Sequence, residues 1–285
     1  MKIKDTIQLF RDELKNLYSA EEIENFIFFS MNEYLGFTRR HLQLKANQSL
    51  GEKETERFKT ILAELKNHKP IQYILGHTEF YGLKIRVNEY VLIPRPETEE
   101  LVEIILEENP SAENILDIGT GSGCIAISLK KNLPDVTVSA LDISDEALLI
   151  AKENAILNHT LINFLQGDIL SVHFSSTEHT NNFDIIVSNP PYVRESEKNK
   201  MSKNVLDYEP HLALFVDNNN PLVFYDSIAD FALKNLSENG KLYFEINEAL
   251  GKDVKKLLDE KGFKNVEIKK DMIGKDRIVI GKIKN

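Results

Sequence analysis

The residues best suited to chemistry form the tetrapeptide Asn189-Pro190-Pro191-Tyr192, which directly follows an apolar run at 183–188. Two consecutive prolines fix φ and remove two backbone donors, so this corner of the chain is rich in hydrogen-bond acceptors. Asn189 precedes a proline and is therefore biased towards an extended conformation. A planar NH2 group could donate one hydrogen to the Asn189 side-chain oxygen and the other to the Pro190 carbonyl, while Tyr192 packs against its flat face. The motif predicts a site for a planar amino nitrogen; a loop with a Pro-Pro stop is the purely structural alternative.

A second candidate site is the glycine-rich turn Gly119-Thr120-Gly121-Ser122-Gly123, which follows the apolar run 114–118. Glycines let a backbone approach a ligand closely, and the helix expected after the turn offers unpaired N–H groups. The spacing is G-x-G-x-G and not the G-x-G-x-x-G of dinucleotide-binding folds. Asp117, just before the turn, would repel a pyrophosphate and would suit a cationic ligand. A tight turn without a ligand remains the alternative.

Acidic residues end the next two expected strands. Asp142 follows the run 136–141, where an acid can accept hydrogen bonds from both ribose hydroxyls, although Asp142 or Ser144 could instead cap the next helix. Asp168 follows Gly167 and could accept a hydrogen bond from an adenine amino group. Because ligands bind at the carboxyl ends of strands in an open parallel sheet, we expect these acids and the glycine turn to lie together.

The elements that position these residues fall into two regions. Residues 1–70 show the three- and four-residue apolar spacing of amphipathic helices and predict a small bundle of four, at 3–17, 20–35, 38–44 and 52–67. Apolar alternation at Leu83, Ile85 and Val87, resumed at Val91 and Ile93, predicts a β-hairpin whose turn is Asn88-Glu89. The expected organisation is a helical bundle at 1–70, a hairpin linker at 71–95 and a second domain at 96–285.

Strand and helix patterns alternate in the second domain, which predicts an α/β fold with a mainly parallel sheet covered by helices. Two stretches, 171–182 and 190–220, are expected to be irregular. The expected strands are 114–118, 136–141, 162–166, 183–188, 241–246, 265–269 and 277–281, and the expected helices are 97–108, 122–131, 144–158, 221–236 and 249–261.

Composition limits the function. The 285 residues carry 35 Lys and Arg against 45 Asp and Glu, for a net charge of −10, which excludes a simple basic nucleic-acid binder. Cys124 is the single cysteine, and none of the seven histidines, His173 and His179 included, has metal-ligand spacing, so no metal is expected. The charged start of the chain and the absence of an apolar run near the ~18 residues of a membrane span favour a soluble cytoplasmic protein with no membrane partner.

Several longer motifs resemble the PrmC/HemK family of release factor glutamine methyltransferases. They are 70–76 (PIQYILG), 93–99 (IPRPETE), 187–192 (VSNPPY), 208–210 (YEP) with Ala213 and Leu214, and 274–277 (GKDR). The resemblance implies a Rossmann-like S-adenosylmethionine-dependent methyltransferase domain with a mostly parallel seven-stranded sheet, preceded by a helical bundle and a β-hairpin linker. It also implies methyl transfer to the side-chain amide nitrogen (N5) of the glutamine in the GGQ motif of class I peptide chain release factors. The chain departs from the family after Asn247, where it reads Glu248-Ala249-Leu250-Gly251 in place of a Gly- and Gln-containing turn.

The resemblance also implies residue roles. Asn189, Pro190 and Tyr192 would be catalytic and, with Pro191, would bind the glutamine amide. S-adenosylmethionine, which leaves as S-adenosylhomocysteine, would contact Asn189 and residues of the glycine turn and strand ends: Asp117, Gly119, Thr120, Gly121, Ser122, Gly123, Asp142, Ile143, Asp168 and Ile169. Arg95, Glu97 and Glu99 either shape the wall of the site or form a salt-bridged helix start.

Two other functions stay open on the sequence. An adenine-N6 methyltransferase acting on DNA or RNA would use Asn189 to Tyr192 equally well but needs a basic groove. A non-catalytic nucleotide-binding module would have no use for that motif. Residues 1–70 carry a net charge of +1 and the remainder −11, so we expect an acidic surface that steers a basic protein partner, the release factor, with no direct contact to nucleic acid. The bundle would help to grip this partner, and a monomer is expected.

Overall fold

The computed structural model describes residues 1–171 and 183–283, so the expectations for His173, His179 and most of the stretch 171–182 lie outside it. The chain forms two compact units. One comprises Met1–Gly76 together with Ser202–Tyr208, and the other comprises His77–Met201 together with Glu209–Asn285.

The first unit is helical, as the apolar spacing of its sequence predicts. Its helices are α1 (Ile3–Leu14), α2 (Ala20–Leu35), α3 (Arg39–Leu44), α4 (Glu52–Lys66) and α5 (Ile71–Leu75). Ser19 begins α2 with a capping box, in which its hydroxyl accepts from the Glu22 N–H at 3.3 Å and Glu22 accepts from the Ser19 N–H at 2.9 Å. The core contains Phe10, Leu14 and Phe58, which are almost completely buried. The one-turn helix α5 was not expected, because five residues are too few to show a period.

Part of the long stretch 190–220 belongs to the helical unit. Helix α9 (Lys203–Leu206) lies in this part, and the Tyr208 hydroxyl donates to the Asn67 carbonyl at 2.8 Å. The stretch is not irregular as expected, since it also contains η2 (Glu195–Lys200), η3 (His211–Ala213) and two short strands, β7 (Val193–Arg194) and β8 (Phe215–Val216), which pair in parallel. Elements of two to six residues leave no hydrophobic pattern that a sequence can reveal.

The hairpin lies earlier in the chain than predicted. Strands β1 (His77–Phe80) and β2 (Leu83–Arg86) pair in antiparallel register, and the turn is Tyr81-Gly82 instead of Asn88-Glu89. Both turn residues have positive φ, 49° and 71°, as a two-residue type I′ hairpin turn requires. The Glu99 carboxylate accepts from the Tyr81 N–H at 2.7 Å and holds this turn. The prediction was wrong because β1 is mostly polar, whereas the buried positions Val91 and Ile93 lie outside any strand.

The second unit contains the predicted seven-stranded sheet, in the order β10-β11-β9-β6-β3-β4-β5. Strand β11 runs antiparallel to both of its neighbours, and all other pairs are parallel. The strands are β3 (Asn114–Ile118), β4 (Thr137–Asp142), β5 (Asn163–Gln166), β6 (Phe183–Ser188), β9 (Leu236–Glu245), β10 (Lys264–Lys270) and β11 (Asp276–Lys282).

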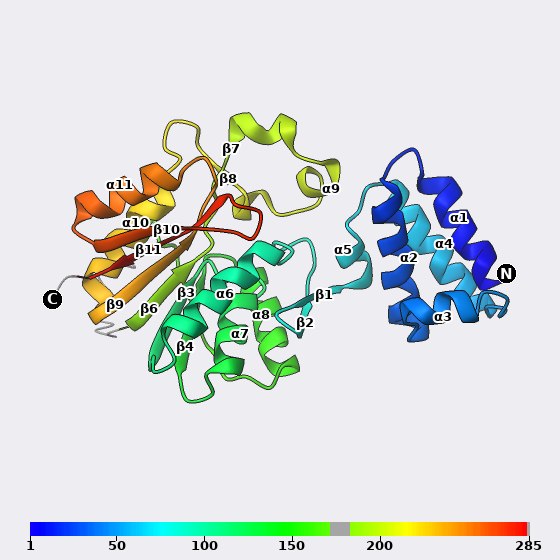
Figure 1. Cartoon of the computed structure of the whole chain (residues 1–285), viewed down its shortest axis with the longest axis horizontal. Coiled ribbons are helices and arrows are strands. Elements are labelled where there is room, and N and C mark those ends of the chain that lie inside the picture. The colour runs from blue at the N-terminus through cyan, green and yellow to red at the C-terminus, as the bar shows by residue number, and fades with distance from the viewer. Residues whose placement is uncertain (172–182, 284–285) are drawn as a thin grey trace. The chain divides into compact units, whose positions relative to one another are not determined.

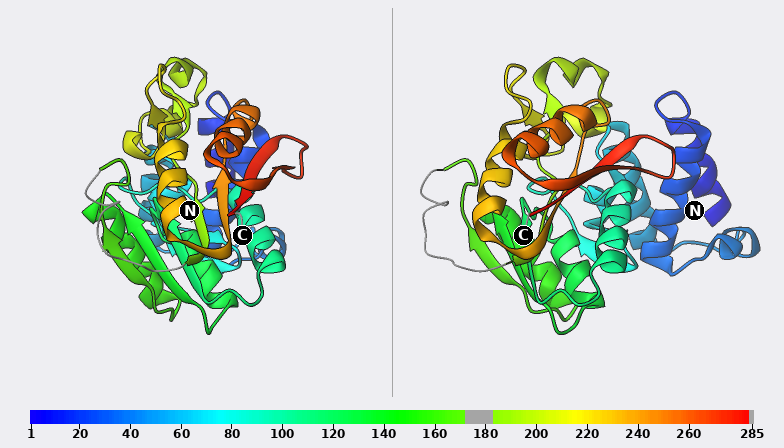
Figure 2. Two further views of the ribbon diagram at one scale, coloured as in Figure 1. Left: turned by 90° about the vertical axis from the view of Figure 1, so that its left-hand side faces the viewer. Right: turned by 60° about the vertical axis from the view of Figure 1, so that its left-hand side comes forward.

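Helices cover both faces of this sheet, with α6, α7 and α8 on one face and α10 and α11 on the other (Figures 1 and 2). Their bounds are α6 (Pro96–Glu108), α7 (Cys124–Asn132), α8 (Asp145–Leu157), α10 (Val223–Asn235) and α11 (Gly251–Lys261). Leu116 and Ile118 of β3 share a core with Tyr225 of α10 and Val254 of α11. Ile115 and Asp117, whose side chains point to the other face of the sheet, are also buried, as expected for a central parallel strand.

The register brings the carboxyl ends of three strands level. Ile118 at the end of β3 pairs with Leu141 of β4 and with Ser188 of β6. The Ser188 hydroxyl also donates to the Ile118 carbonyl at 2.7 Å. The glycine turn, Asp142 and Asn189 therefore all lie at the same edge of the sheet.

The glycine turn generates a prediction about stability. Gly123 has φ +80°, and a Cβ there would lie 3.1 Å from both the Ala151 Cβ and the Ile127 Cδ1, whereas a Cβ on Gly119, with φ +73°, would meet nothing within 4 Å. Alanine at either position costs about 1–2 kcal/mol for the left-handed conformation, and Gly123→Ala adds about 1–3 kcal/mol of overpacking between α7 and α8. Urea denaturation should therefore show Gly123→Ala to be the less stable variant. Equal stabilities would contradict the packing role.

Candidate functional site

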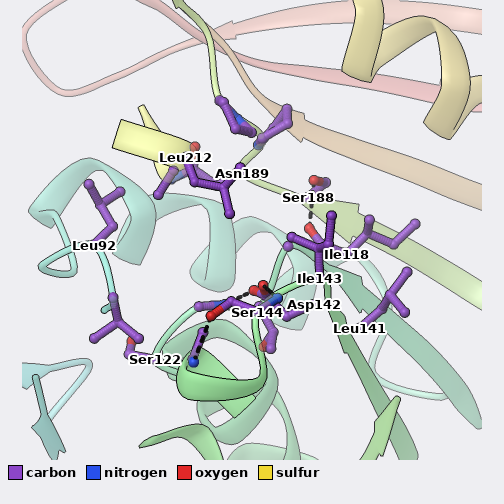
Figure 3. A pocket seen from close by; sticks show the side chains of 18 of the residues that line it. Leu92, Ile118, Ser122, Leu141, Asp142, Ile143, Ser144, Ser188, Asn189 and Leu212 are labelled. Atoms are coloured by element: carbon purple, nitrogen blue, oxygen red, sulfur yellow. Dashed lines mark hydrogen bonds between the residues drawn. The ribbon is translucent and has the colours of Figure 1, made fainter. Parts of the chain in front are cut away.

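A cavity of about 370 Å³ lies at the edge where β3, β4 and β6 end, within the size range of small-molecule sites. Figure 3 shows Asn189 and Leu212 on one side of it and Asp142, Ser144 and Ser122 on the other. The predicted site residues that line the cavity are Gly119, Thr120, Gly121, Ser122, Asp142, Ile143, Asp168, Ile169, Asn189, Pro190 and Pro191. Asp117, Gly123 and Tyr192 are not part of its wall, and Gly123 instead faces α8.

Asp142 faces the cavity with its carboxylate already fixed by backbone donors. One oxygen accepts from the Gly121 N–H at 2.8 Å and the other from the Ser144 N–H at 3.0 Å. Burial raises the pKa of Asp142, and these N–H groups act in the opposite direction. The helix cap belongs to Ser144, whose hydroxyl accepts from the Ala147 N–H at 3.1 Å. Each Asp142 oxygen thus keeps acceptor capacity for a ligand with two neighbouring hydroxyls.

Asp117 lies beneath the glycine turn and has no exposed surface. The Thr120 hydroxyl donates to one of its oxygens at 2.6 Å, while the other oxygen has no hydrogen-bond partner among the described residues. Burial, and to a lesser degree the charge of Asp142, raises the pKa of Asp117 to about 7, although the Thr120 hydroxyl and the nearby Ala126 N–H act in the opposite direction. A cationic group close to the turn would favour the charged form of this carboxyl.

The wall of the cavity near Asp142 is largely apolar. Ile143, Ile169 and Leu170 line the cavity there, and Ile143 and Leu170 are partly open to solvent. Asp168 lies among them, and its side chain accepts from the Leu170 N–H at 2.8 Å. Apolar walls beside one carboxylate suit a flat heterocycle that carries an amino group.

A chain of hydrogen bonds lies behind Asn189. The Asn189 amide N–H donates to the Thr98 hydroxyl at 3.4 Å, and this hydroxyl donates to a Glu245 carboxylate oxygen at 2.7 Å. The Tyr192 hydroxyl donates to the other Glu245 oxygen at 3.4 Å, and the Tyr192 ring packs on the core between the sheet and α10 and α11. Contact between Tyr192 and a substrate therefore stays a prediction.

A buried acid also supports the opposite wall. Glu209, which is 3% exposed, forms an ion pair with Arg95 and accepts from the Ile93 N–H at 3.2 Å. Arg95 lines the cavity, so it both shapes the wall and belongs to an ion pair. Glu97 and Glu99 do not line the cavity, and Glu99 holds the hairpin turn instead.

Sequence reasoning missed three residues of the site: Thr98, Glu209 and Glu245. Glu245 leaves a usable signal, because it is a single acid at the end of the apolar run 242–246 and such an acid needs a buried partner. Thr98 and Glu209 lie inside the motifs 93–99 and 208–210, but neither stands in an apolar run that would mark it as a buried polar residue.

Two kinds of chemistry find no support in the described residues. Within 1–171 and 183–283, no three His, Cys, Asp or Glu side chains gather as a metal site. Cys124 lines the cavity, but burial raises the pKa of its thiol to about 12, which disfavours a nucleophilic thiolate.

Among the helices described, none is long and apolar enough to cross a membrane.

Comparison with known proteins identifies the class of this fold and site. Residues 97–209 match the model of the methyltransferase small domain. A solved methyltransferase from Pyrococcus furiosus superposes with a TM-score of 0.53 at 20% identity, covering 81% of this chain and 98% of that one. The second unit is therefore a methyltransferase fold.

Further matches extend over the rest of the chain. Residues 5–76 match the PrmC N-terminal domain. The release factor glutamine methyltransferase of Flavobacterium psychrophilum is 51% identical, over 98% of both chains. That of Bacteroides thetaiotaomicron is 45% identical, over 94% of this chain and 96% of its own. The chain belongs to the release factor glutamine methyltransferase family.

The raised pKa of Asp117 predicts a pH-dependent stability. With a folded pKa of about 7 against an ordinary 3.8, the folded state binds more protons than the unfolded state between these values. Asp117 therefore lowers the free energy of unfolding as pH rises from about 4 to 7, and the loss is complete above 7. Asp117→Asn removes this contribution. The free energy of unfolding of the variant minus that of the parent should therefore be larger at pH 8 than at pH 5. Urea denaturation at both pH values measures this, and a pH-independent difference would contradict the raised pKa.

Proposed function

We propose that this protein transfers a methyl group from S-adenosylmethionine to the side-chain amide nitrogen of the glutamine in the GGQ motif of class I peptide chain release factors. The observation that carries the proposal is one cavity that joins the acceptors of Asn189 and Pro190 to the glycine turn and Asp142. Family membership supports the same substrate, because its members bear the name of this reaction.

The residues at one end of the cavity fit S-adenosylmethionine, which when bound supplies a sulfonium methyl group. Gly119 to Ser122 would hold its methionine part, and the ammonium, bound above the turn, would favour the charged form of Asp117 beneath it. Asp142, with Ile143 beside it, would accept from the ribose hydroxyls. Asp168 and Ile169 would border the adenine.

The residues at the other end fit a primary amide. An amide nitrogen is a poor nucleophile because its lone pair is delocalised into the carbonyl. The Asn189 side-chain oxygen and the Pro190 carbonyl would accept its two N–H groups, hold the nitrogen in line with the methyl group and stabilise the positive charge that grows on it. Positioning of this kind supplies roughly 7–11 kcal/mol of barrier lowering. No base is needed before transfer, because the nitrogen becomes acidic once it is methylated.

The partner would be a whole protein. The acidic residues 71–285, with a net charge of −11, suit a substrate whose own surface is basic, and the helical residues 1–70 would help to grip it. The expected boundaries were a β-hairpin linker at 71–95 and a catalytic domain at 96–285, whereas the compact units group the hairpin with the sheet and Ser202–Tyr208 with the helices. We propose a cytoplasmic monomer that binds no nucleic acid directly.

The test is a transfer assay with methyl-labelled S-adenosylmethionine. The parent protein should label a class I release factor and should label neither its GGQ→GGA variant nor plasmid DNA. Asn189→Ala removes one of the two proposed acceptors and should lower the rate at least ~100-fold, in line with the loss of a pre-aimed group at other active sites, while the thermal melting curve stays unchanged.

Three results of this assay would contradict the proposal. Label on the GGA variant would show that another residue is methylated, and label on DNA would favour adenine-N6 methylation. Full activity in Asn189→Ala would remove Asn189 from the mechanism.

A further inference from the structure

Glu245 connects the side chains on both sides of the acceptor corner. It ends β9 and is 1% exposed. One oxygen of its carboxylate accepts a hydrogen bond from the Thr98 hydroxyl at 2.7 Å, and the other accepts one from the Tyr192 hydroxyl at 3.4 Å. Glu245 does not line the cavity, whereas Thr98 and Asn189 do. Any effect of Glu245 on a substrate must therefore pass through its neighbours.

The carboxylate decides which group donates and which accepts in each of these hydrogen bonds. An ionised carboxylate can only accept, so the hydrogen of the Thr98 hydroxyl is committed to Glu245. The Thr98 oxygen then offers Asn189 lone pairs and no hydrogen. Asn189 satisfies it with its amide N–H at 3.4 Å, and its amide oxygen is left for the cavity.

The surroundings of Glu245 act on its charge in both directions. Burial and, to a lesser degree, the charge of Glu97 raise the pKa of Glu245, while the Thr98 hydroxyl, the Arg277 guanidinium and the Tyr192 hydroxyl favour the ionised form. Arg277 is itself held in place by Asp271, which accepts from its Nε at 3.2 Å.

We propose that Glu245 is a positioning residue, which acts through Thr98 to set the Asn189 amide with its oxygen towards the substrate nitrogen. The inference rests on the proposed function. The two ends of an asparagine amide have nearly the same size, so packing alone does not choose between them. In the reversed orientation Asn189 would present an NH2 group to the substrate NH2 group, and neither could accept. The buried carboxylate thus makes the site selective for a hydrogen-bond donor.

The first test separates the Thr98 hydroxyl from the shape of the side chain. Thr98→Val keeps the volume and removes the hydroxyl, so kcat for methylation of a release factor should fall about tenfold, the worth of one net hydrogen bond. Thr98→Ser keeps the hydroxyl and should restore most of kcat. The dissociation constant for S-adenosylmethionine, measured by calorimetry, should stay the same in both variants.

The second test asks whether Glu245 acts through Thr98. Glu245→Gln lets an amide N–H face Thr98 and should also lower kcat about tenfold. If the two residues form one relay, the Thr98→Val/Glu245→Gln double variant should be about as slow as Thr98→Val alone. Two independent structural roles would instead multiply to about a hundredfold loss.

Tyr225→Phe is the matched control, because it removes a hydroxyl that donates to the Glu245 backbone carbonyl at 3.3 Å and leaves the side-chain relay intact. It should keep the kcat of the parent protein. The inference is overturned if Thr98→Val retains full kcat, if Thr98→Ser is as slow as Thr98→Val, or if the double variant shows the multiplied loss. Failure of the proposed function would look different, since the parent protein itself would then leave the release factor unlabelled.

Discussion

The parallel register of β3 with β4 and β6 is the constraint on which the site depends. Ile118, Leu141 and Ser188 lie side by side, so the segments that follow them leave the sheet at the same level. A shift of one residue would move every side chain of β3 to the opposite face of the sheet and would place the Asp117 carboxyl in the apolar core that now holds Leu116 and Ile118. The hydrophobic core itself therefore holds this alignment. The bond from the Ser188 hydroxyl to the Ile118 carbonyl ties β6 to β3 at the point where the cavity begins.

Buried carboxylates then support the cavity from three sides. Asp117 lies under the glycine turn, Glu209 behind Arg95, and Glu245 behind Thr98 and Asn189. Each costs desolvation energy, which its hydrogen-bond donors offset only in part at Asp117, where one oxygen lacks a described partner. An apolar residue would be the less costly choice for stability alone, so we interpret these acids as groups that orient the wall of the site.

Local patterns predict the elements that are long and the residues that end them. Seven strands, the major helices, and the approach of the glycine turn to Asp142 and Asn189 all follow from hydrophobic period and from the geometry of a parallel sheet. The hairpin was misplaced because the period-two alternation continues through Val91 and Ile93, which are buried without pairing as a strand. Thr98 and Glu245 were missed because they are 147 residues apart, and their contact exists only in the folded sheet.

The pairing of rigid prolines with an asparagine explains why a buried charge is useful here. Pro190 and Pro191 fix the backbone, so the Pro190 carbonyl can point in one direction. The asparagine amide can rotate, and its oxygen and nitrogen are nearly equal in size, so half of the acceptor pair has no direction of its own. A neutral hydroxyl could not supply one, because it donates as readily as it accepts. A carboxylate cannot donate, and the hydrogen-bond direction that it imposes on Thr98 reaches Asn189 although the Glu245 carboxylate itself lies outside the cavity wall.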